Sequence, residues 1–178
     1  ITITPMAKTL IQYILLYIVL VLLQALVFNR ICIFNVAVPY IFILFIIRLP
    51  VSLSINALLS VSFAIGLTVD IFSDTLGMHA LSCTLLGLLR KPILSLYMPR
   101  EDDVEGLIPT MRNIGFPVFL KYSFSVSLVY CIIISAVQML TFSASAILLL
   151  RMVGSTILTS LIIWGIECLI NSGSAQRL

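Results

Sequence analysis

Long apolar runs separated by short polar interruptions make up almost the whole chain. Six runs can be marked off, at about 10–28, 36–49, 51–72, 76–98, 116–140 and 144–170. A helix needs about 20 predominantly apolar residues to cross a bilayer, and five of the runs suit that length while the second is shorter. The pattern predicts an all-α integral membrane protein, with residues 1–178 forming a single polytopic domain. We expect one compact bundle of about six transmembrane helices.

The interruptions predict how these helices are connected. Residues 73–75 read Ser-Asp-Thr, which is N-cap chemistry for the fourth helix and predicts a tight hairpin. Residues 99–115 form the one long polar segment and are expected to be the only sizeable extramembrane loop. The third run carries a face of small and polar residues, which lets helix backbones approach closely, so we expect a central helix there. The small and polar residues of that face are Ser52, Ser54, Asn56, Ser60, Ser62 and Gly66.

Composition strengthens the membrane prediction. Hydrophobic residues make up 61% of the chain and charged residues 10%, and the mean hydropathy is +1.23. A soluble domain carries about 25% charged residues. The net charge of +3 comes from residues scattered at helix ends, so it predicts no nucleic-acid patch. We treat residues 1–5 as an upstream extension or a misassigned start, because Met6-Ala7-Lys8 resembles a natural initiation site.

The distribution of basic residues predicts the orientation. The chain has ten Lys and Arg residues, and with the N-terminus inside only Arg30 and Arg151 fall on the outer side. This asymmetry favours cytoplasmic termini and a cytoplasmic 99–115 loop. In a five-span alternative the short second run is re-entrant, and the C-terminus then lies outside.

Several polar side chains interrupt the spans on the predicted outer side. They are Gln24, Asp70, His79, Gln138 and Arg151. Charges inside a membrane face protein or water and need partners, so we expect one polar network in which Asp70 pairs with Arg151 or His79. Such a network is either a site for a proton, a ligand or a partner helix, or an interhelical lock that fixes the packing. Asp70, Asp74 and His79 could also ligate a metal across the hairpin, but the spacing is unspecific and we expect no metal.

Polar residues at the inner side have simpler interpretations. Glu167, one turn from the end of the last helix, is expected to form a salt bridge with Lys121. Arg90 and Lys91 are expected to anchor the fourth helix by snorkelling to anionic lipid headgroups, with a specific lipid or partner site as the alternative. No nucleophile with a base, phosphate loop or specific ligand cluster is evident, so we expect no enzyme and no cofactor.

The segment GLTVDIFSDTLGMHALSCTLLGLLRKP, residues 66–92, resembles the core of the MreD family of rod shape-determining membrane proteins. The resemblance is carried by Gly66, Asp70, Gly77, His79 and Ala80, with similar chain length and span number. It implies a non-enzymatic, multi-pass subunit of the bacterial inner membrane that binds MreC. RodA, the elongation transpeptidase and, indirectly, MreB would be further partners.

A second hypothesis comes from another class of protein. The MreD family also looks like the six-helix substrate-binding subunits of energy-coupling vitamin transporters. Such a subunit requires a deep outward cavity lined by aromatic and polar side chains. Few aromatic residues lie near Asp70, so the sequence favours the interaction protein.

Overall fold

The computed structural model describes residues 5–28, 37–75, 77–98, 107–141 and 146–175. This part of the chain is built from helices, as the apolar runs predicted. The elements are α1 (Pro5–Leu23), the π-helical turn η1 (Gln24–Phe28), α2 (Ile43–Arg48), α3 (Ile55–Ser73), α4 (Met78–Tyr97), α5 (Met111–Ile114), α6 (Phe116–Thr141) and α7 (Ala146–Ala175).

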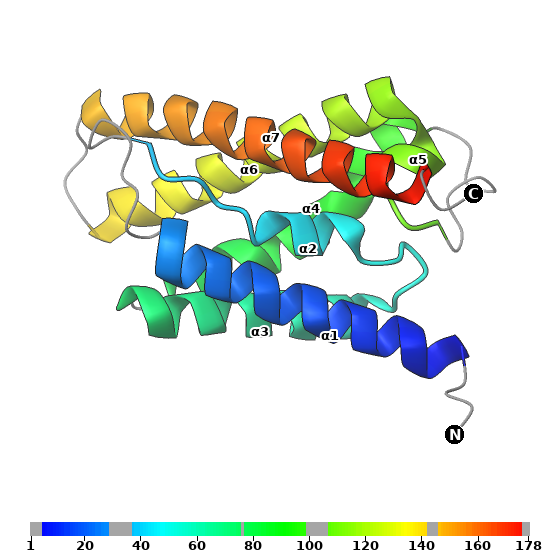
Figure 1. Cartoon of the computed structure of the whole chain (residues 1–178). Coiled ribbons are helices and arrows are strands. Elements are labelled where there is room, and N and C mark those ends of the chain that lie inside the picture. Colours follow the sequence, from blue (N-terminus) through cyan, green and yellow to red (C-terminus); the bar gives the residue numbers. More distant parts are fainter. Residues whose placement is uncertain (1–4, 29–36, 76, 99–106, 142–145, 176–178) are drawn as a thin grey trace.

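The long helices run alternately between two ends of the bundle (Figure 1). The turn between α3 and α4 lies at one end, which we call the hairpin end, together with the last turn of α6 and the first turn of α7. The start of α1 and the last turn of α7 lie at the opposite end, which we call the terminal end. Helices α3, α4, α6 and α7 pack as successive neighbours, and α1 lies against α3.

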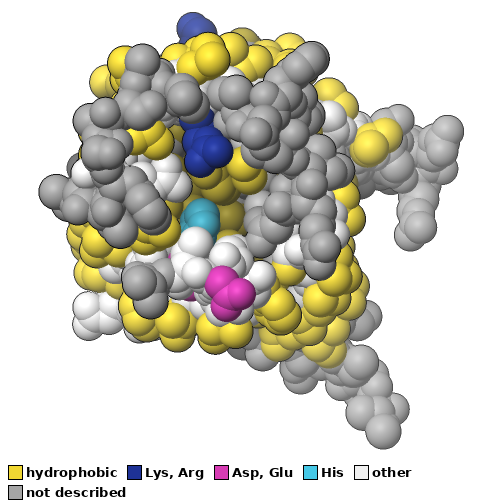
Figure 2. All heavy atoms as spheres, turned by 90° about the vertical axis from the view of Figure 1, so that its left-hand side faces the viewer, with side chains coloured by type: hydrophobic (Ala, Val, Ile, Leu, Met, Phe, Trp, Pro, Cys, Tyr) yellow, Lys and Arg dark blue, Asp and Glu magenta, His cyan; other side chains and the backbone are white. Residues whose placement is uncertain are grey.

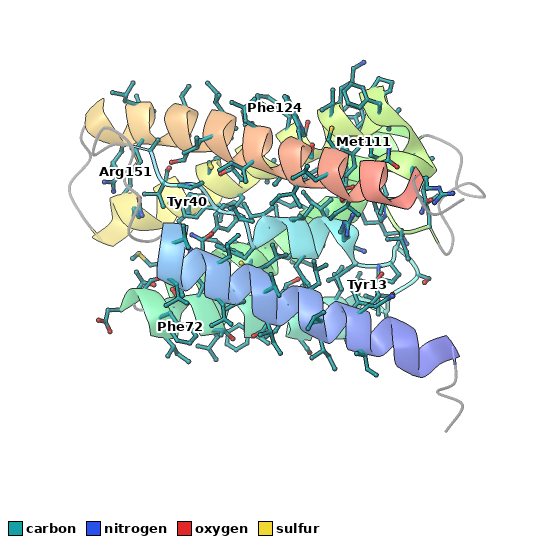
Figure 3. The ribbon with its side chains drawn as sticks, in the orientation of Figure 1. Tyr13, Tyr40, Phe72, Met111, Phe124 and Arg151 are labelled. Carbon is teal, nitrogen blue, oxygen red and sulfur yellow. The ribbon has the colours of Figure 1, made fainter. Side chains whose placement is uncertain are left out.

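Three helical stretches in the described residues are long and apolar enough to cross a membrane. They are Ile55–Ser73, Phe116–Met139 and Leu148–Asn171. Helix α1 and the following turn η1 together contain a shorter apolar stretch, Ile11–Val27. Large apolar side chains such as Phe72 and Phe124 lie on the outer surface of the bundle, as expected for surfaces that face lipid (Figure 3). Six crossings and cytoplasmic termini stay predictions.

The second apolar run is not the continuous helix that we predicted. After an extended stretch, 37–40, the backbone turns into α2, which is six residues long. Pro39 lies in the extended stretch and not in a first helical turn, and the neighbouring backbone groups are bound by side chains from other helices. Residues Ile43 to Ile47 of α2 are all buried, which is the expected setting for a helix that is apolar on every side.

Helix α2, not α3, therefore lies inside the bundle. Helix α3 is peripheral, with one face against α4 and another exposed at Phe63, Leu67 and Ile71. The prediction of a central third helix was wrong because its small residues lie on two different faces. Ser62 and Gly66 are buried, whereas Asn56 and Ser60 are exposed.

Candidate functional site

The turn between α3 and α4 is organised by the carboxylate of Asp70. Its Oδ1 accepts a hydrogen bond from the backbone N–H of His79 at 3.0 Å, and its Oδ2 accepts one from Ala80 N–H at 2.8 Å. The Thr75 hydroxyl also donates to Oδ1. Free N–H groups at a helix N-terminus carry partial positive charge, so they stabilise a carboxylate there. Asp70, on the last turns of α3, thus caps the start of α4.

Asp74 does not cap the fourth helix, in contrast to the prediction. It ends α3 in the left-handed conformation, with φ of 51°, and its side chain is exposed. Helix α4 begins at Met78, after Gly77 with φ of 74°. The prediction failed because the capping oxygen comes from a residue one helical turn earlier, on the neighbouring helix.

Gly66 brings α3 and α4 into direct backbone contact. A Cβ atom at this position would lie 2.5 Å from the Ala80 Cα and 2.5 Å from the His79 carbonyl oxygen. Glycine is therefore required by the close approach of the two helices, as at small-residue contacts between membrane helices generally. The residues that carry the family resemblance form one tightly packed hairpin.

Replacing the two aspartates of the hairpin should have different effects. We expect Asp70→Ala to lower the free energy of unfolding by about 1–2 kcal/mol, because it removes the cap of α4. Asp74→Gly should leave it unchanged or raise it slightly, since glycine adopts a positive φ without strain. Thermal unfolding of the two variants in detergent provides the measurement. A larger loss for Asp74→Gly would contradict the assignment of the cap.

His79 lies next to the hairpin, in an aromatic cluster. Its Nδ1 lies 2.6 Å from the Tyr130 hydroxyl oxygen, and its ring centroid is 5.8 Å from that of Tyr40 and 5.9 Å from that of Phe42. The expected contact between Asp70 and His79 is therefore made through the backbone N–H, while the imidazole binds a tyrosine. Arg151 is not among the partners of the Asp70 carboxylate.

Arg151 and Gln138 lie together at the hairpin end. Both line a small pocket with Tyr40, Cys131 and Ser155, and Figure 3 labels Arg151 and Tyr40 there. The pocket encloses no space large enough for a water molecule. The residues of the predicted polar network are thus found at the capped hairpin, beside this pocket and in the contacts of Gln24, and their connection into one network stays a prediction.

Gln24 binds the extended stretch at the start of the second run. Gln24 is the first residue of η1, and its Nε2 donates to the Pro39 carbonyl of this stretch at 3.0 Å. Its Oε1 accepts from Ile41 N–H at 2.9 Å. Non-helical backbone groups at membrane depth must form hydrogen bonds with other protein groups, and Gln24 provides two of these bonds.

Two hydroxyl groups on α7 complete this arrangement, and sequence reasoning missed both. Ser155 Oγ accepts from Val38 N–H at 3.0 Å, and Thr159 Oγ1 accepts from Tyr40 N–H at 3.0 Å. The available signal was their spacing of one helical turn, which places both hydroxyls on one face of α7. Small residues of this kind are common in membrane helices, so the spacing alone does not identify a partner.

Replacing threonine by the isosteric valine should distinguish a hydroxyl that binds the second run from one that binds its own helix. We expect Thr159→Val to lower the free energy of unfolding by about 1–3 kcal/mol, because the buried Tyr40 N–H loses its acceptor. Thr156→Val is the matched control, since its hydroxyl donates to the Met152 carbonyl of its own helix. Hydrogen exchange at the Tyr40 amide should become faster in the first variant only. Equal effects in both variants would contradict the assigned bond.

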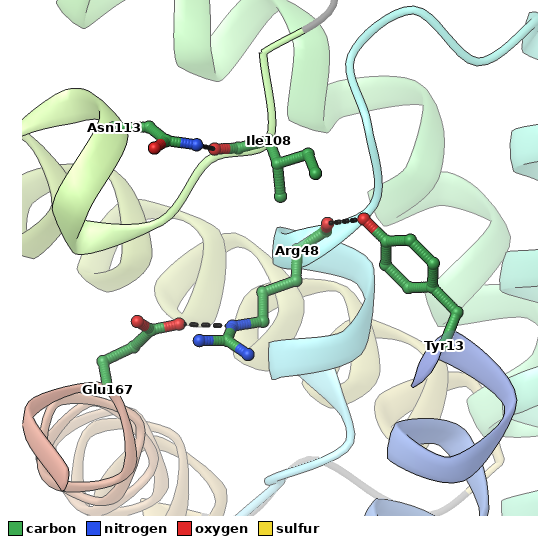
Figure 4. A network of polar contacts seen from close by, with 5 residues as sticks. All are labelled: Tyr13, Arg48, Ile108, Asn113 and Glu167. Atoms are coloured by element: carbon green, nitrogen blue, oxygen red, sulfur yellow. Dashed lines mark hydrogen bonds and ion pairs between the residues drawn. The ribbon is translucent and has the colours of Figure 1, made fainter. Parts of the chain in front are cut away.

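At the terminal end Glu167 pairs with Arg48, not with Lys121. The Arg48 Nε lies 2.5 Å from Glu167 Oε1, and Figure 4 shows this pair beside the hydrogen bond from the Tyr13 hydroxyl to the Arg48 carbonyl. Lys121 is exposed. The prediction failed because Arg48 ends the enclosed helix α2 and is directed towards α7.

Arg90 does not reach the lipid headgroups, so this part of the prediction was also wrong. Its side chain is buried and donates to the carbonyls of Ile46 and Pro50, both at 2.6 Å. The Ile46 carbonyl belongs to the last turn of α2, where C=O groups lack helical partners and a cation is favourable, and Pro50 lies two residues beyond the helix. Lys91 is exposed, in a position that suits headgroup anchoring.

Most of the buried charged side chains therefore stabilise the fold, by binding backbone groups or one another. Within the described ranges, no group of three or more His, Cys, Asp or Glu residues is placed to hold a metal ion. Comparison with protein-family models, with curated proteins and with solved structures gives no match. The interpretation of the site thus depends on its own geometry.

Proposed function

We propose that this chain is a non-enzymatic, multi-pass subunit of the cell-elongation machinery in the bacterial inner membrane. Its role would be to dock an MreC-like single-span protein, alongside RodA and the elongation transpeptidase. The resemblance to the MreD family supports this proposal, because Gly66, Asp70 and Ala80 all contribute to one hairpin. A shared hairpin gives these residues a common structural role.

The proposed topology has six crossings with both termini cytoplasmic, and the length of the second segment is compatible with it. The four residues 37–40 and the six residues of α2, 43–48, with a two-residue turn between them, would reach about 22 Å at about 3.3 Å and 1.5 Å per residue. The hydrocarbon core is about 30 Å thick, so a partly extended second segment could cross most of it despite its short length. The excess of basic residues at the terminal end supports the same orientation.

The observation that carries the proposal is the outward face of α3. Asn56, Ser60 and Ala64 follow one another at intervals of four residues, and all three are exposed. On the opposite face of α3, small residues already pack closely against α4. A Cβ at Gly87 of α4 would lie 2.8 Å from Ser62 Oγ. Small side chains allow a membrane helix to approach closely, so we assign the outward stripe to the single span of the partner.

The transporter hypothesis has less support from the described residues. A substrate-binding subunit needs a cavity that encloses most of its ligand. The pocket beside Arg151 and Gln138 does not admit a water molecule. Among the described residues that line it, Tyr40 is the one aromatic residue, and its ring also packs against His79.

Site-specific photo-crosslinking tests the proposal. A photoreactive residue at Ser60 or Ala64, in cells that express the chain with the MreC homologue of the same genome, should crosslink that protein. The matched control is Leu161, which is exposed on α7 and should not crosslink it. Ser60→Trp should also abolish co-purification of the two proteins, while Leu161→Trp should not. Crosslinking to nucleotide-binding subunits would overturn the proposal in favour of a transporter.

A further inference from the structure

The single histidine of the chain lies at the hairpin end, where part of its side chain reaches the surface. His79 is 8% exposed, and Figure 2, which looks onto this end, shows the imidazole from outside. The rest of the residue is enclosed by an aromatic cluster. Its ring centroid lies 5.8 Å from that of Tyr40, 5.9 Å from that of Phe42 and 6.4 Å from that of Tyr130. Protons from the solution at this end therefore reach a group that is packed into the bundle.

The hydrogen bond between His79 and Tyr130 determines which ring nitrogen carries the proton. The Tyr130 side chain is completely buried, and its hydroxyl oxygen lies 2.6 Å from His79 Nδ1. If Nδ1–H were the donor, the Tyr130 O–H would need a second acceptor, and the described part of the chain provides none. The hydroxyl therefore donates to Nδ1, and the neutral imidazole carries its proton on Nε2. The nitrogen that takes up a further proton is thus the one that binds Tyr130.

The groups around this cluster would not stabilise a positive charge on the ring. Asp70 is the one anion among them, and its carboxylate already accepts hydrogen bonds from two N–H groups of α4 and from the Thr75 hydroxyl. A charge in an enclosed site without a free partner is costly, so we expect the folded cluster to contain the neutral imidazole. The titratable and charged residues that surround the cluster are Asp70 of α3, Tyr40 before α2, Cys83 of α4, Tyr130 and Cys131 of α6, and Arg151 of α7.

We propose that His79 and Tyr130 form a pH-sensitive switch at the hairpin end. While the imidazole is neutral, the bond from Tyr130 holds α4 against α6, and the rings of Tyr40 and Phe42 pack against both side chains. A proton on Nδ1 turns this nitrogen into a donor, so the Tyr130 hydroxyl loses its acceptor in a buried site. The two side chains then separate, and the second run is released from α4 and α6 at this end. The terminal end keeps its packing.

Amide hydrogen exchange of the full chain in detergent, at about pH 7.5 and about pH 5, tests the proposal, because a free histidine titrates at about pH 6.5. Each exchange rate is divided by the intrinsic rate at the same pH, which gives a protection factor. The protection of the Tyr40 amide, which binds Thr159, should fall at least about fivefold at the lower pH. The buried segment around Ile163, towards the terminal end of α7, should keep its protection. An equal loss in both segments, or no loss at Tyr40, would overturn the proposal.

Two variants assign the loss of protection to this hydrogen bond. In His79→Asn the side-chain Oδ1 takes about the place of Nδ1, so it accepts from the Tyr130 hydroxyl and does not titrate. This variant should have the same protection at both pH values. Tyr130→Phe lacks the hydroxyl, so its loss of protection on acidification should be smaller than that of the unchanged protein. A full loss on acidification in either variant would contradict the switch.

The single histidine allows a second measurement on the unchanged chain, since 15N-histidine labelling gives the signals of one imidazole. At the higher pH, Nε2 should be protonated and Nδ1 should not. The loss of protection at Tyr40 should then follow the protonation of Nδ1, with the same midpoint. A protonated Nδ1 at the higher pH, or two different midpoints, would overturn the proposal. This measurement decides the proposal even if a variant fails to fold.

Discussion

Replacing Arg48 by methionine should lower the free energy of unfolding by about 3–5 kcal/mol, the largest effect that we expect. The change leaves the Glu167 carboxylate without its partner, and Glu167 is 2% exposed. An uncompensated charge in a buried site is costly because the interior solvates it poorly. Thermal unfolding in detergent, followed through the reactivity of the buried thiols Cys83 and Cys131, would measure the loss.

The double variant Arg48→Met, Glu167→Met is the informative control. It removes both charges together, so it should regain most of the lost stability, as buried ion pairs replaced by apolar groups commonly do. Lys121→Met should have little effect, since Lys121 is exposed. A destabilised Lys121→Met with a stable Arg48→Met would show that Glu167 has the partner that the sequence suggested.

Gly66→Ala should lower the free energy of unfolding by about 3 kcal/mol, at the upper end of the usual cost of overpacking. The new Cβ would lie 2.5 Å from the Ala80 Cα, and backbone atoms cannot rotate away as a side chain can. Helices α3 and α4 would have to separate, which would also weaken the bonds from Asp70 to α4.

Gly165→Ala is the matched control for Gly66→Ala. No atom lies within 4 Å of the Cβ position at Gly165, so alanine should be tolerated there or slightly stabilising. Thermal unfolding of both variants in the same detergent makes the comparison. Equal stability of the two would mean that α3 and α4 are farther apart than the structure shows.

The helices were predictable because the relevant signal is local. Apolar runs predicted α3, α4 and α6 to within four residues at each end, whereas α1 begins five residues before its predicted run and α7 ends five residues after its own. The α3–α4 hairpin was also predicted, since Ser73 to Gly77 have turn chemistry. Which aspartate caps α4 could not be read from the chain, because Asp70 and Asp74 are one helical turn apart and either can supply a carboxylate.

The second run and the ion pairs depend on residues far away in the sequence. The extended backbone at Val38 and Tyr40 is stable only because Ser155 and Thr159 accept its N–H groups. Likewise, Glu167 and Lys121 lie near the same predicted membrane surface, but the arginine that reaches Glu167 is on the enclosed helix α2. An apolar run predicts that a segment lies in the membrane or in the protein interior. It does not predict which distant side chains bind the polar groups of that segment.

The dependence of the second segment on α7 has a consequence for biogenesis. Membrane helices usually insert one by one, each stable in lipid before it meets its neighbours. The stretch at Val38 and Tyr40 cannot be stable in that way, since its acceptors lie 117 and 119 residues later in the chain. We therefore expect this segment to reach its final position only after α7 has been synthesised. Helix α7, which is translated after the other described helices, then completes the inside of the bundle.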